Sequence, residues 1–285
     1  MNTRDEAGST PLHGAAANGD PAVIKALIEA GAEVDVRNEY GLTPLHFAAW
    51  PNDNPAIIEA LIEAGAEVNV WDKDGDTPLH RAAWLNDNPA IITALVSAGA
   101  RVNTRDENGD TPLHRAAWPN DNPAIIAALV SAGAEVNARD EDGRTPLYFA
   151  AGLNDSPAII TALLDAGADV AARGEDGYTP LHAAAGLNDN PAIIAALVSA
   201  GAEVNARAES GEQPNVWSTD EDGATPLHYA ARDNNNPAII ATLLDAGADV
   251  AARDTDGKIP WDYAKDREEL RGTAVYWRLN EGRFR

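Results

Sequence analysis

The apolar residues of this chain recur in short stripes whose spacing predicts helices. In the segment NPAIIEALIEAGA, which begins at Asn54, four apolar residues stand at positions i, i+1, i+4 and i+5 and would share one helix face. They are Ile57, Ile58, Leu61 and Ile62. Asn54 can cap the helix, Pro55 suits its first position because no hydrogen bond is lost there, and Gly65 suits a left-handed end. We therefore expect a helix that begins at Pro55 and ends before Gly65.

A second, shorter helix is predicted where alanines follow a threonine–proline pair. In DGDTPLHRAA, Thr77 can act as the cap and Pro78 as the first helical residue, and the alanines favour about two turns of helix. Just upstream, EVNVWDKDGD indicates an extended segment that turns at Asp74 and Gly75, a pair typical of hairpins. One unit of the chain is thus expected to contain two helices and a hairpin finger.

The same unit is repeated along nearly the whole chain. The string TPLH, with TPLY and a degenerate IPWD as variants, recurs at spacings of 33, 34, 34, 34, 34, 46 and 34 residues. It starts at Thr10, Thr43, Thr77, Thr111, Thr145, Thr179, Thr225 and Ile259. The string AGA, which follows the longer helix, recurs seven times. A fixed period of this length indicates a repeat array, in which each unit buries its apolar face against its neighbours.

Two helices and a finger that carry TPLHxAA and GAxVNxRDxxG resemble the ankyrin repeat. The resemblance implies an all-α repeat solenoid of about seven ankyrin repeats with a C-terminal cap. It implies L-shaped units whose short first helices and β-hairpin fingers line a concave face. It also implies a protein-binding module and not an enzyme, with no cofactor.

Departures from the period define the expected domain organisation. Residues 1–259 form the array, residues 208–219 form a 12-residue finger insertion, and residues 260–285 form a degenerate capping repeat. The cap has five apolar residues available to cover the last core: Trp261, Leu270, Val275, Trp277 and Leu279. Because MNTRDEAGSTPLH matches a finger sequence, the chain opens inside a finger, and we favour an upstream segment that precedes it.

The loops between the two helices of each unit also depart from the family pattern. The first unit keeps a glycine there, Gly19, whereas most of the others have Asn-rich loops that are one residue longer, such as PNDN. Asparagine tolerates the left-handed backbone better than most residues do. We therefore expect these asparagines to adopt the conformation that the glycine would take.

The charge of the chain narrows the class of partner. The formal net charge is −24, which disfavours nucleic acid and anionic membranes and favours a protein with a basic surface. The absence of cysteine excludes disulfides and leaves the compartment open, either cytoplasmic or, after removal of an upstream signal, secreted or periplasmic. We expect a monomer, and the excess of arginine over lysine favours a bacterial source.

No residue pattern favours catalysis or a metal. All six histidines occupy the fourth position of TPLH, where the resemblance implies a structural role in bonding neighbouring fingers. The acidic residues recur at equivalent finger and loop positions, whereas acid–base catalysis needs one special pair. The segment DKDGD at Asp72 resembles the start of a calcium loop, but the later glutamate of that pattern is missing.

Three tryptophans interrupt the regular pattern at equivalent positions. Trp50, Trp84 and Trp118 follow the alanine pair of the short helix, where two later units have Gly152 and Gly186. In the structural interpretation each indole packs over its enlarged loop. In the functional interpretation the three form an aromatic floor for a partner. Because two repeats have glycine at this position before a loop of the same length, the loop alone does not require tryptophan.

We expect a partner-binding surface around these tryptophans, because tryptophan and arginine are enriched in interface hot spots. Its residues are Trp50, Trp84, Trp118, Trp71, Tyr40, Leu42, Phe47, Arg81, Arg115, Phe149 and Tyr178. The favoured function is a protein–protein interaction module that binds on the concave face and has an aromatic and arginine floor and acidic fingers. The alternatives are an acidic inhibitor or immunity protein that blocks a basic enzyme, and a regulatory domain of a larger protein.

Overall fold

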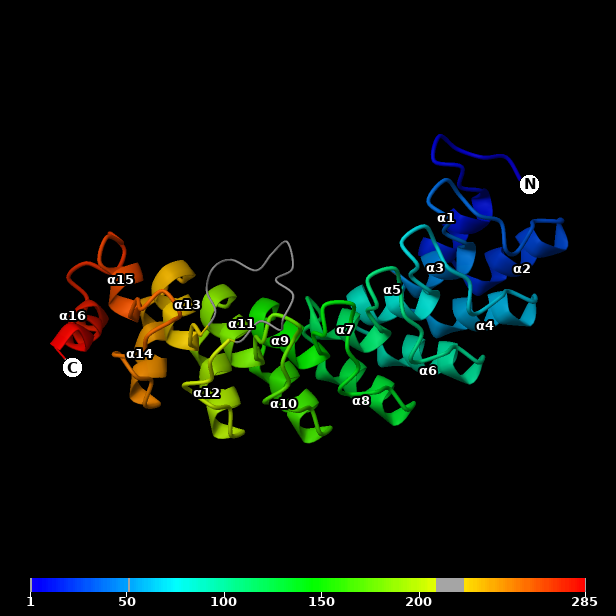
Figure 1. Cartoon of the computed structure of the whole chain (residues 1–285). Helices are drawn as coiled ribbons and strands as arrows, with labels where there is room; N and C mark the ends of the chain where they lie inside the picture. Colours follow the sequence, from blue (N-terminus) through cyan, green and yellow to red (C-terminus); the bar gives the residue numbers. More distant parts are fainter. Residues whose placement is uncertain (1, 51, 209–222, 285) are drawn as a thin grey trace. The chain divides into compact units, whose positions relative to one another are not determined.

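Pairs of short helices make up the structure, a computed structural model that describes residues 2–50, 52–208 and 223–284 (Figure 1). The first helices of the pairs are α1 (Pro11–Asn18), α3 (Pro44–Ala49), α5 (Pro78–Leu85), α7 (Pro112–Ala117), α9 (Pro146–Leu153), α11 (Pro180–Leu187) and α13 (Pro226–Asp233). The second helices are α2 (Pro21–Glu29), α4 (Pro55–Glu63), α6 (Pro89–Ser97), α8 (Pro123–Ser131), α10 (Pro157–Asp165), α12 (Pro191–Ser199) and α14 (Pro237–Asp245). The chain ends with α15 (Pro260–Ala264), α16 (Ala274–Asn280) and a 3₁₀ helix, η1 (Glu281–Phe284).

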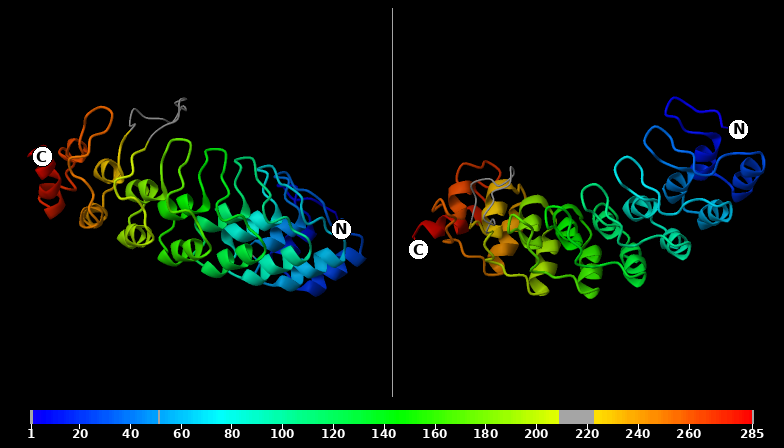
Figure 2. Two further views of the ribbon diagram at one scale, coloured as in Figure 1. Left: turned by 60° about the horizontal axis from the view of Figure 1, so that its bottom comes forward. Right: turned by 45° about the vertical axis from the view of Figure 1, so that its right-hand side comes forward.

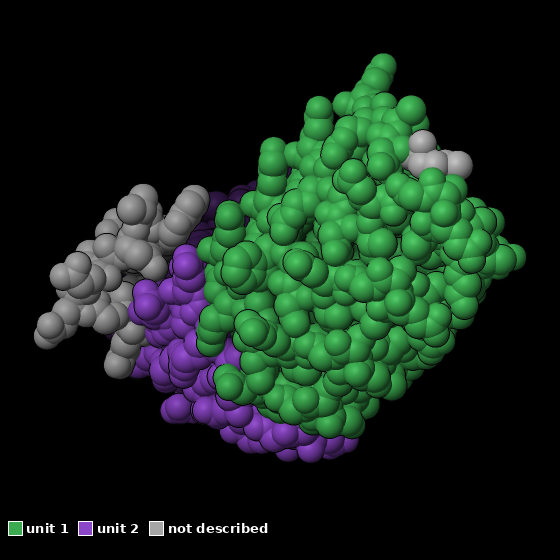
Figure 3. All heavy atoms as spheres, turned by 90° about the vertical axis from the view of Figure 1, so that its right-hand side faces the viewer, with its two compact units in different colours: residues 1–136 green, residues 137–285 purple. Residues whose placement is uncertain are grey.

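The helices form two compact units, Met1–Val136 and Asn137–Arg285 (Figure 3). In the first unit, α1, α3, α5 and α7 pack side by side in one row, and α2, α4, α6 and α8 form a second row. In the second unit, α9, α11, α13 and α15 form one row and α10, α12 and α14 the other. Within each unit the fingers extend to one side of the helices (Figure 2). The architecture confirms the expected all-helical repeat solenoid.

The residues that were expected to begin and fill the helices do so. Asn54 caps α4 by accepting a hydrogen bond from the backbone N–H of Ala56 at 3.1 Å, and Pro55 is the first helical residue. Ile57, Ile58 and Leu61 are fully buried, which contributes roughly 1.5–3 kcal/mol each. Ile62 is only half-buried. Gly65 ends the helix with φ +92°, the left-handed conformation expected there.

The fingers turn where expected, but the described residues of the chain contain no β-strand. In one finger the N–H of Asp72 donates to the carbonyl of Asp76 at 3.0 Å, and the N–H of Gly75 donates to the carbonyl of Asp72 at 3.3 Å. Gly75 has φ +78°, and a Cβ atom there would lie 2.7 Å from the backbone nitrogen of Glu107 in the next finger. The expectation of β-hairpins was wrong because bonds between successive fingers and from side chains replace a strand ladder.

The expectation that loop asparagines take a left-handed backbone was also wrong. Among the described residues, glycine alone has a positive φ, and Asn86, at the end of α5, has φ −99°. Its side chain explains its presence. The amide nitrogen donates to the carbonyls of Ala49 and Asn52 at 3.0 and 2.8 Å, and the amide oxygen accepts from the N–H of Asn88 at 2.8 Å. The buried amide therefore joins one loop to the loop of the preceding repeat.

The same amide bridge recurs in both units. In the first unit Asn120 donates to the carbonyls of Ala83 and Asn86 at 3.2 and 3.0 Å. In the second unit Asn234 donates to the carbonyls of Ala185 and Asn188 at 3.2 and 2.8 Å. Because a buried polar group without a partner is costly, each bridge favours the stacked array over the separate repeat.

The C-terminal helices α15 and α16 pack against the last helix pair, α13 and α14, and the expected cap residues differ in burial. Leu270, Val275 and Leu279 are buried, and the Trp261 ring meets the Tyr276 ring edge-on at 4.6 Å between centroids. Trp277 is 60% exposed, so the expectation that it covers the core was wrong. The boundary at residue 260 stays a prediction. Residues 209–219 of the expected insertion lie outside the described residues.

Candidate binding site on the finger side of the N-terminal unit

The three tryptophans lie at the ends of the short helices of the N-terminal unit, and their exposure differs. Trp50 and Trp118 are the residues that follow α3 and α7, and their exposed fractions are 42% and 38%. Both precede a proline in the sequence, which disfavours helical backbone and ends the helix early. Trp84 precedes leucine instead, so α5 continues through it and the indole is half-buried. Local sequence therefore decides which indole is presented outward.

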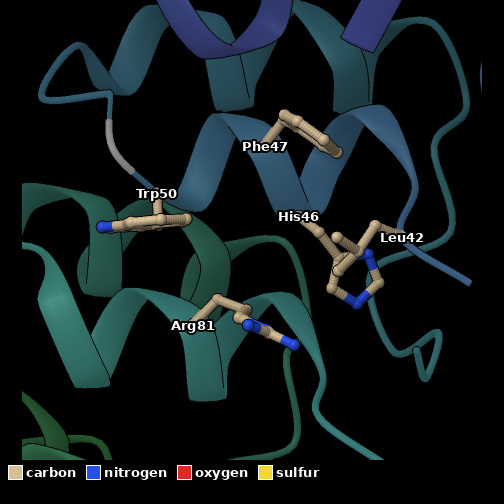
Figure 4. A pocket seen from close by; sticks show the side chains of 5 residues that line it. All are labelled: Leu42, His46, Phe47, Trp50 and Arg81. Carbon is tan, nitrogen blue, oxygen red and sulfur yellow. The ribbon is translucent and has the colours of Figure 1, made fainter. Parts of the chain in front are cut away.

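A small apolar pocket lies beside Trp50. We name it the Trp50 pocket, and it has a volume of about 40 Å³ (Figure 4). Its lining consists of Leu42, His46, Phe47, Trp50 and Arg81. Leu42 comes from the finger, the next three residues from α3 or its end, and Arg81 from the neighbouring α5. The pocket is thus formed between two successive repeats, so an apolar side chain placed in it would contact both.

A larger polar pocket lies beside Trp84, and we name it the Trp84 pocket. It has a volume of about 400 Å³. Its lining consists of Asp74, Asp76, Arg81, Trp84, Glu107, Asn108 and Arg115. Asp74 and Asp76 come from one finger, and Glu107 and Asn108 from the next. Because Arg81 lines both pockets, they are neighbours on the same side of the unit.

The two arginines of the Trp84 pocket are held by buried carboxylates. Arg81 lies 2.5 Å from Asp72 and 3.4 Å from Asp76. Arg115 lies 2.5 Å from Asp106 and 3.4 Å from Asp76. The guanidinium carbon of Arg81 also lies 5.9 Å from the ring centroid of Trp84. The arginines therefore lie near tryptophan as expected, but each guanidinium group already forms ion pairs with aspartates of the fingers.

Three polar atoms on the lining of the Trp84 pocket lack hydrogen-bond partners. The indole nitrogen Nε1 of Trp84 is buried and donates to no protein group. Asp76 is 3% exposed, and its Oδ1 atom accepts no hydrogen bond, although Arg115 is in ion-pair range. Burial raises the pKa of the Asp76 carboxyl to about 6, and Arg115 and Arg81 oppose that shift. The Nε–H of Arg115 also donates to no group, so two donors and one acceptor are unsatisfied in one pocket.

Sequence reasoning missed Asp76, and a signal for it exists within the repeats. The residue before TPL and the residue five positions later face each other in several units. Asp76 and Arg81 form an ion pair, Arg144 stacks on Phe149 at 5.0 Å, and Lys258 lies 5.3 Å from the Tyr263 ring. Leu42 and Phe47 line the Trp50 pocket together. A comparison of these two sequence positions across the repeats would have identified the pair of Asp76 and Arg81.

The remaining expected site residues are divided between the two units. Tyr40 and Trp71 are exposed on fingers of the N-terminal unit, with exposed fractions of 61% and 57%. Phe149 and Tyr178 belong to the C-terminal unit and line neither pocket. Tyr178 accepts a hydrogen bond from the hydroxyl of Tyr229 at 2.5 Å. The structure thus brings Leu42, Phe47, Trp50, Trp84, Arg81 and Arg115 together around two neighbouring pockets.

The histidines are structural, as the resemblance implied. The N–H of Thr43 donates to Nδ1 of His46 at 3.1 Å, which leaves the ring proton on Nε2 to donate to the carbonyl of Asp76 at 3.1 Å. His80 and His182 make the same pair of bonds. Burial lowers the pKa of each of these three imidazoles to about 4. They are neutral connectors between a short helix and the next finger.

Two further observations concern other classes of protein. Among the described residues, no group of three or more histidines or carboxylates is arranged to hold a metal ion. No helix within that part of the chain has both the length and the apolar character needed to cross a bilayer.

The fold and the repeated finger contacts define a helical repeat solenoid. Two sequence models of one family match nearly all of the chain. The model described as ankyrin repeats (3 copies) matches residues 1–72, 51–140 and 113–208, and the model described as ankyrin repeats (many copies) matches residues 211–264. The chain belongs to the ankyrin repeat family, whose members generally act as protein–protein interaction modules.

A curated relative supports the same assignment over a short segment. The chain is 54% identical over 39 residues to a protein named putative ankyrin repeat protein from Rickettsia bellii (strain RML369-C). The match covers 14% of this chain and 16% of that relative. The similarity between the two proteins therefore spans little more than one repeat.

Proposed function

We propose that this protein binds a partner protein on the finger side of its N-terminal unit, with Trp50, Trp84 and Trp118 as the centre of the contact. The observation that carries the proposal is the exposure of Trp50 and Trp118 at the ends of α3 and α7, together with the two neighbouring pockets that Trp50 and Trp84 line. Tryptophan is typical of interface hot spots, because burial of its large ring against a partner contributes strongly to binding. The equivalent slots of α9 and α11 hold glycine, so the fold does not need tryptophan there.

The charge of the chain supports a partner with a basic surface. The formal net charge is −24, and two fingers of the N-terminal unit place the carboxylates of Asp74 and Glu107 in the pocket beside Trp84. Complementary charge speeds association and rejects acidic partners more than it increases affinity. The proposed partner therefore combines an apolar segment with positive charges.

The test selects short peptides from a random displayed library on the full chain and measures their affinity for variants. Replacing Trp50 and Trp118 together by alanine should weaken binding by about 2 kcal/mol or more, roughly thirtyfold. The matched control replaces Leu153 and Leu187, two exposed residues at the ends of α9 and α11, by alanine. Equal binding by the tryptophan variant, or an equal loss in the leucine control, would contradict the proposal.

A further inference from the structure

The Trp84 pocket has more negative than positive charge. Within ion-pair range of Arg81 and Arg115 are the five carboxylates of Asp72, Asp74, Asp76, Asp106 and Asp110. Asp72 and Asp106 are fully buried as side chains and take one guanidinium each at 2.5 Å. Asp74, Asp76 and Glu107 remain on the pocket lining as excess negative charge. A further positive group is therefore favoured there, and an anion is repelled.

The unsatisfied groups of the pocket favour both donors and acceptors from outside: a donor for Asp76 Oδ1, and acceptors for the Trp84 indole N–H and the Arg115 Nε–H. The Asp76 Oδ1 atom can accept a hydrogen bond from a cationic head, and the Trp84 indole N–H can donate only to an acceptor such as a peptide carbonyl. A lysine within a peptide brings both, because its ammonium has three donors and its backbone has carbonyls. A bare metal cation would leave the indole without an acceptor.

The neighbouring Trp50 pocket adds an apolar contact. It shares Arg81 with the Trp84 pocket, so an extended segment that crosses Arg81 reaches both. The two fingers that border the Trp84 pocket are joined by a hydrogen bond from the N–H of Glu107 to the carbonyl of Asp74 at 3.3 Å. The pocket is thus bordered on the finger side by linked backbone.

We infer that the Trp84 pocket receives a lysine side chain of the partner, with its ammonium at Asp74, Asp76 and Glu107 and a backbone carbonyl at the Trp84 indole. An apolar residue of the same segment occupies the Trp50 pocket. The inference rests on the proposed function, for which it specifies the partner chemistry.

The experiment titrates the full chain with acetyl-lysine N-methylamide and follows the indole N–H resonances by nuclear magnetic resonance. Trp84→Phe, which keeps an aromatic ring and removes the indole N–H, assigns the Trp84 signal. We expect a saturable shift of that signal, and binding of acetyl-norleucine N-methylamide at least about tenfold weaker because it lacks the charge. Acetyl-arginine N-methylamide should also bind more weakly than the lysine compound, since two guanidinium groups already border the pocket.

Two charge variants test the location of the site. Asp76→Asn should weaken the lysine compound by about fivefold or more, since it removes the buried charge but keeps the shape. Asp155→Asn removes the same charge from an exposed loop of the C-terminal unit and should leave binding unchanged. If Asp76→Asn fails to fold, Glu107→Gln on the exposed finger takes its place.

Several results would overturn the inference. They are no shift of the Trp84 signal, equal binding of the norleucine compound, or equal losses in Asp76→Asn and Asp155→Asn. These outcomes can be distinguished from failure of the proposed function. If selected peptides require Trp50 and Trp118 but show no preference for lysine, only the lysine inference is contradicted. If the lysine compound shifts the Trp84 signal but no peptide binds at the tryptophans, only the proposed function is contradicted.

Discussion

The two compact units are built from the same helix pair, but they differ in the residue that follows the alanine pair of the first helix. We call this position the slot. In two repeats of the N-terminal unit the slot holds Trp50 or Trp84, and the residue of the next repeat in the same pocket is Arg81 or Arg115.

In the C-terminal unit the slot holds Gly186, and a Cβ atom there would lie 3.6 Å from the Cβ of Tyr229 in the next repeat. The other glycine slot, Gly152, neighbours the small Ala183, so the slot residue does not follow the size of its neighbour in every repeat. The difference teaches that the repeat accepts either tryptophan or glycine in this slot, so the fold alone does not explain the exposed tryptophans.

Removing the cap should produce the largest effect. Deleting residues 260–285 exposes the apolar faces of α13 and α14, so we expect aggregation or loss of a cooperative melt, measured by circular dichroism and gel filtration. A milder pair of variants sharpens the result. Trp261→Ala should cost about 3–5 kcal/mol because its ring is buried, and Trp277→Ala should cost less than about 0.5 kcal/mol because its ring is exposed. A monomeric deletion variant with an unchanged melt would refute the cap.

Acid should weaken both units through their buried histidines. His46, His80 and His182 have a folded pKa of about 4, below the ordinary value of 6.5, so the unfolded chain takes up the proton first. Their contribution is complete above pH 6.5 and is lost as the pH falls toward 4. By about pH 5 each should lower the free energy of unfolding by about 2 kcal/mol.

Asp76 opposes this trend in the N-terminal unit. Its folded pKa of about 6 lies above the ordinary 3.8, so it favours the folded state increasingly as the pH falls through 6, by about 1 kcal/mol at pH 5. The net expectation is still a loss of several kcal/mol between about pH 7 and pH 5, measured by urea unfolding. Asp76→Asn should steepen the loss. A stability that stays constant over this range would contradict the buried, neutral histidines.

Exchanging the slot residues between units tests directly whether a slot residue is coupled to its neighbour in the next repeat. Gly186→Trp should destabilise the C-terminal unit by about 1–3 kcal/mol, because the indole would overlap Tyr229. Adding Tyr229→Arg should recover a large part of that loss by reproducing the tryptophan–arginine arrangement of the N-terminal unit. Thermal unfolding of the single and double variants gives the coupling free energy between positions 186 and 229. Additive losses would show that the two slots are independent.

Excising the 12-residue insertion should have the smallest effect. Removing residues 208–219 restores the 34-residue spacing, and polar finger tips tolerate changes in length. We expect a change in the free energy of unfolding within about 1 kcal/mol. If the excised chain fails to fold, the insertion is a packed element of the array.

The sequence predicted most of the fold because its helix signals are local. Proline after a capping residue, paired isoleucines and the glycine at Gly65 define a helix without reference to the rest of the chain. The prediction from sequence failed where the hydrogen-bond partners of a residue lie in the neighbouring repeat. Asn86 was misinterpreted because its amide bonds reach Ala49 and Asn52 in the preceding repeat. Trp277 was misinterpreted because apolar character alone does not say which cap residue faces the core.

The candidate site was predicted in composition but not in electrostatics. Trp50, Phe47 and Arg81 were expected together and line one pocket. The arginines were expected in the binding surface, but the buried aspartates that hold them were not, because those ion pairs depend on distances that no spacing rule supplies. The unsatisfied indole of Trp84 likewise follows from burial in three dimensions.

The central claim is that the tryptophan face binds a partner, and Trp84→Ala tests it most directly. The measurement pairs thermal unfolding with affinity for a selected peptide. We expect a loss of affinity of about 2 kcal/mol or more with a small change in stability, since the indole is half-buried beside an open pocket. A loss of stability of about 3–5 kcal/mol with unchanged affinity of the folded variant would show that Trp84 only packs.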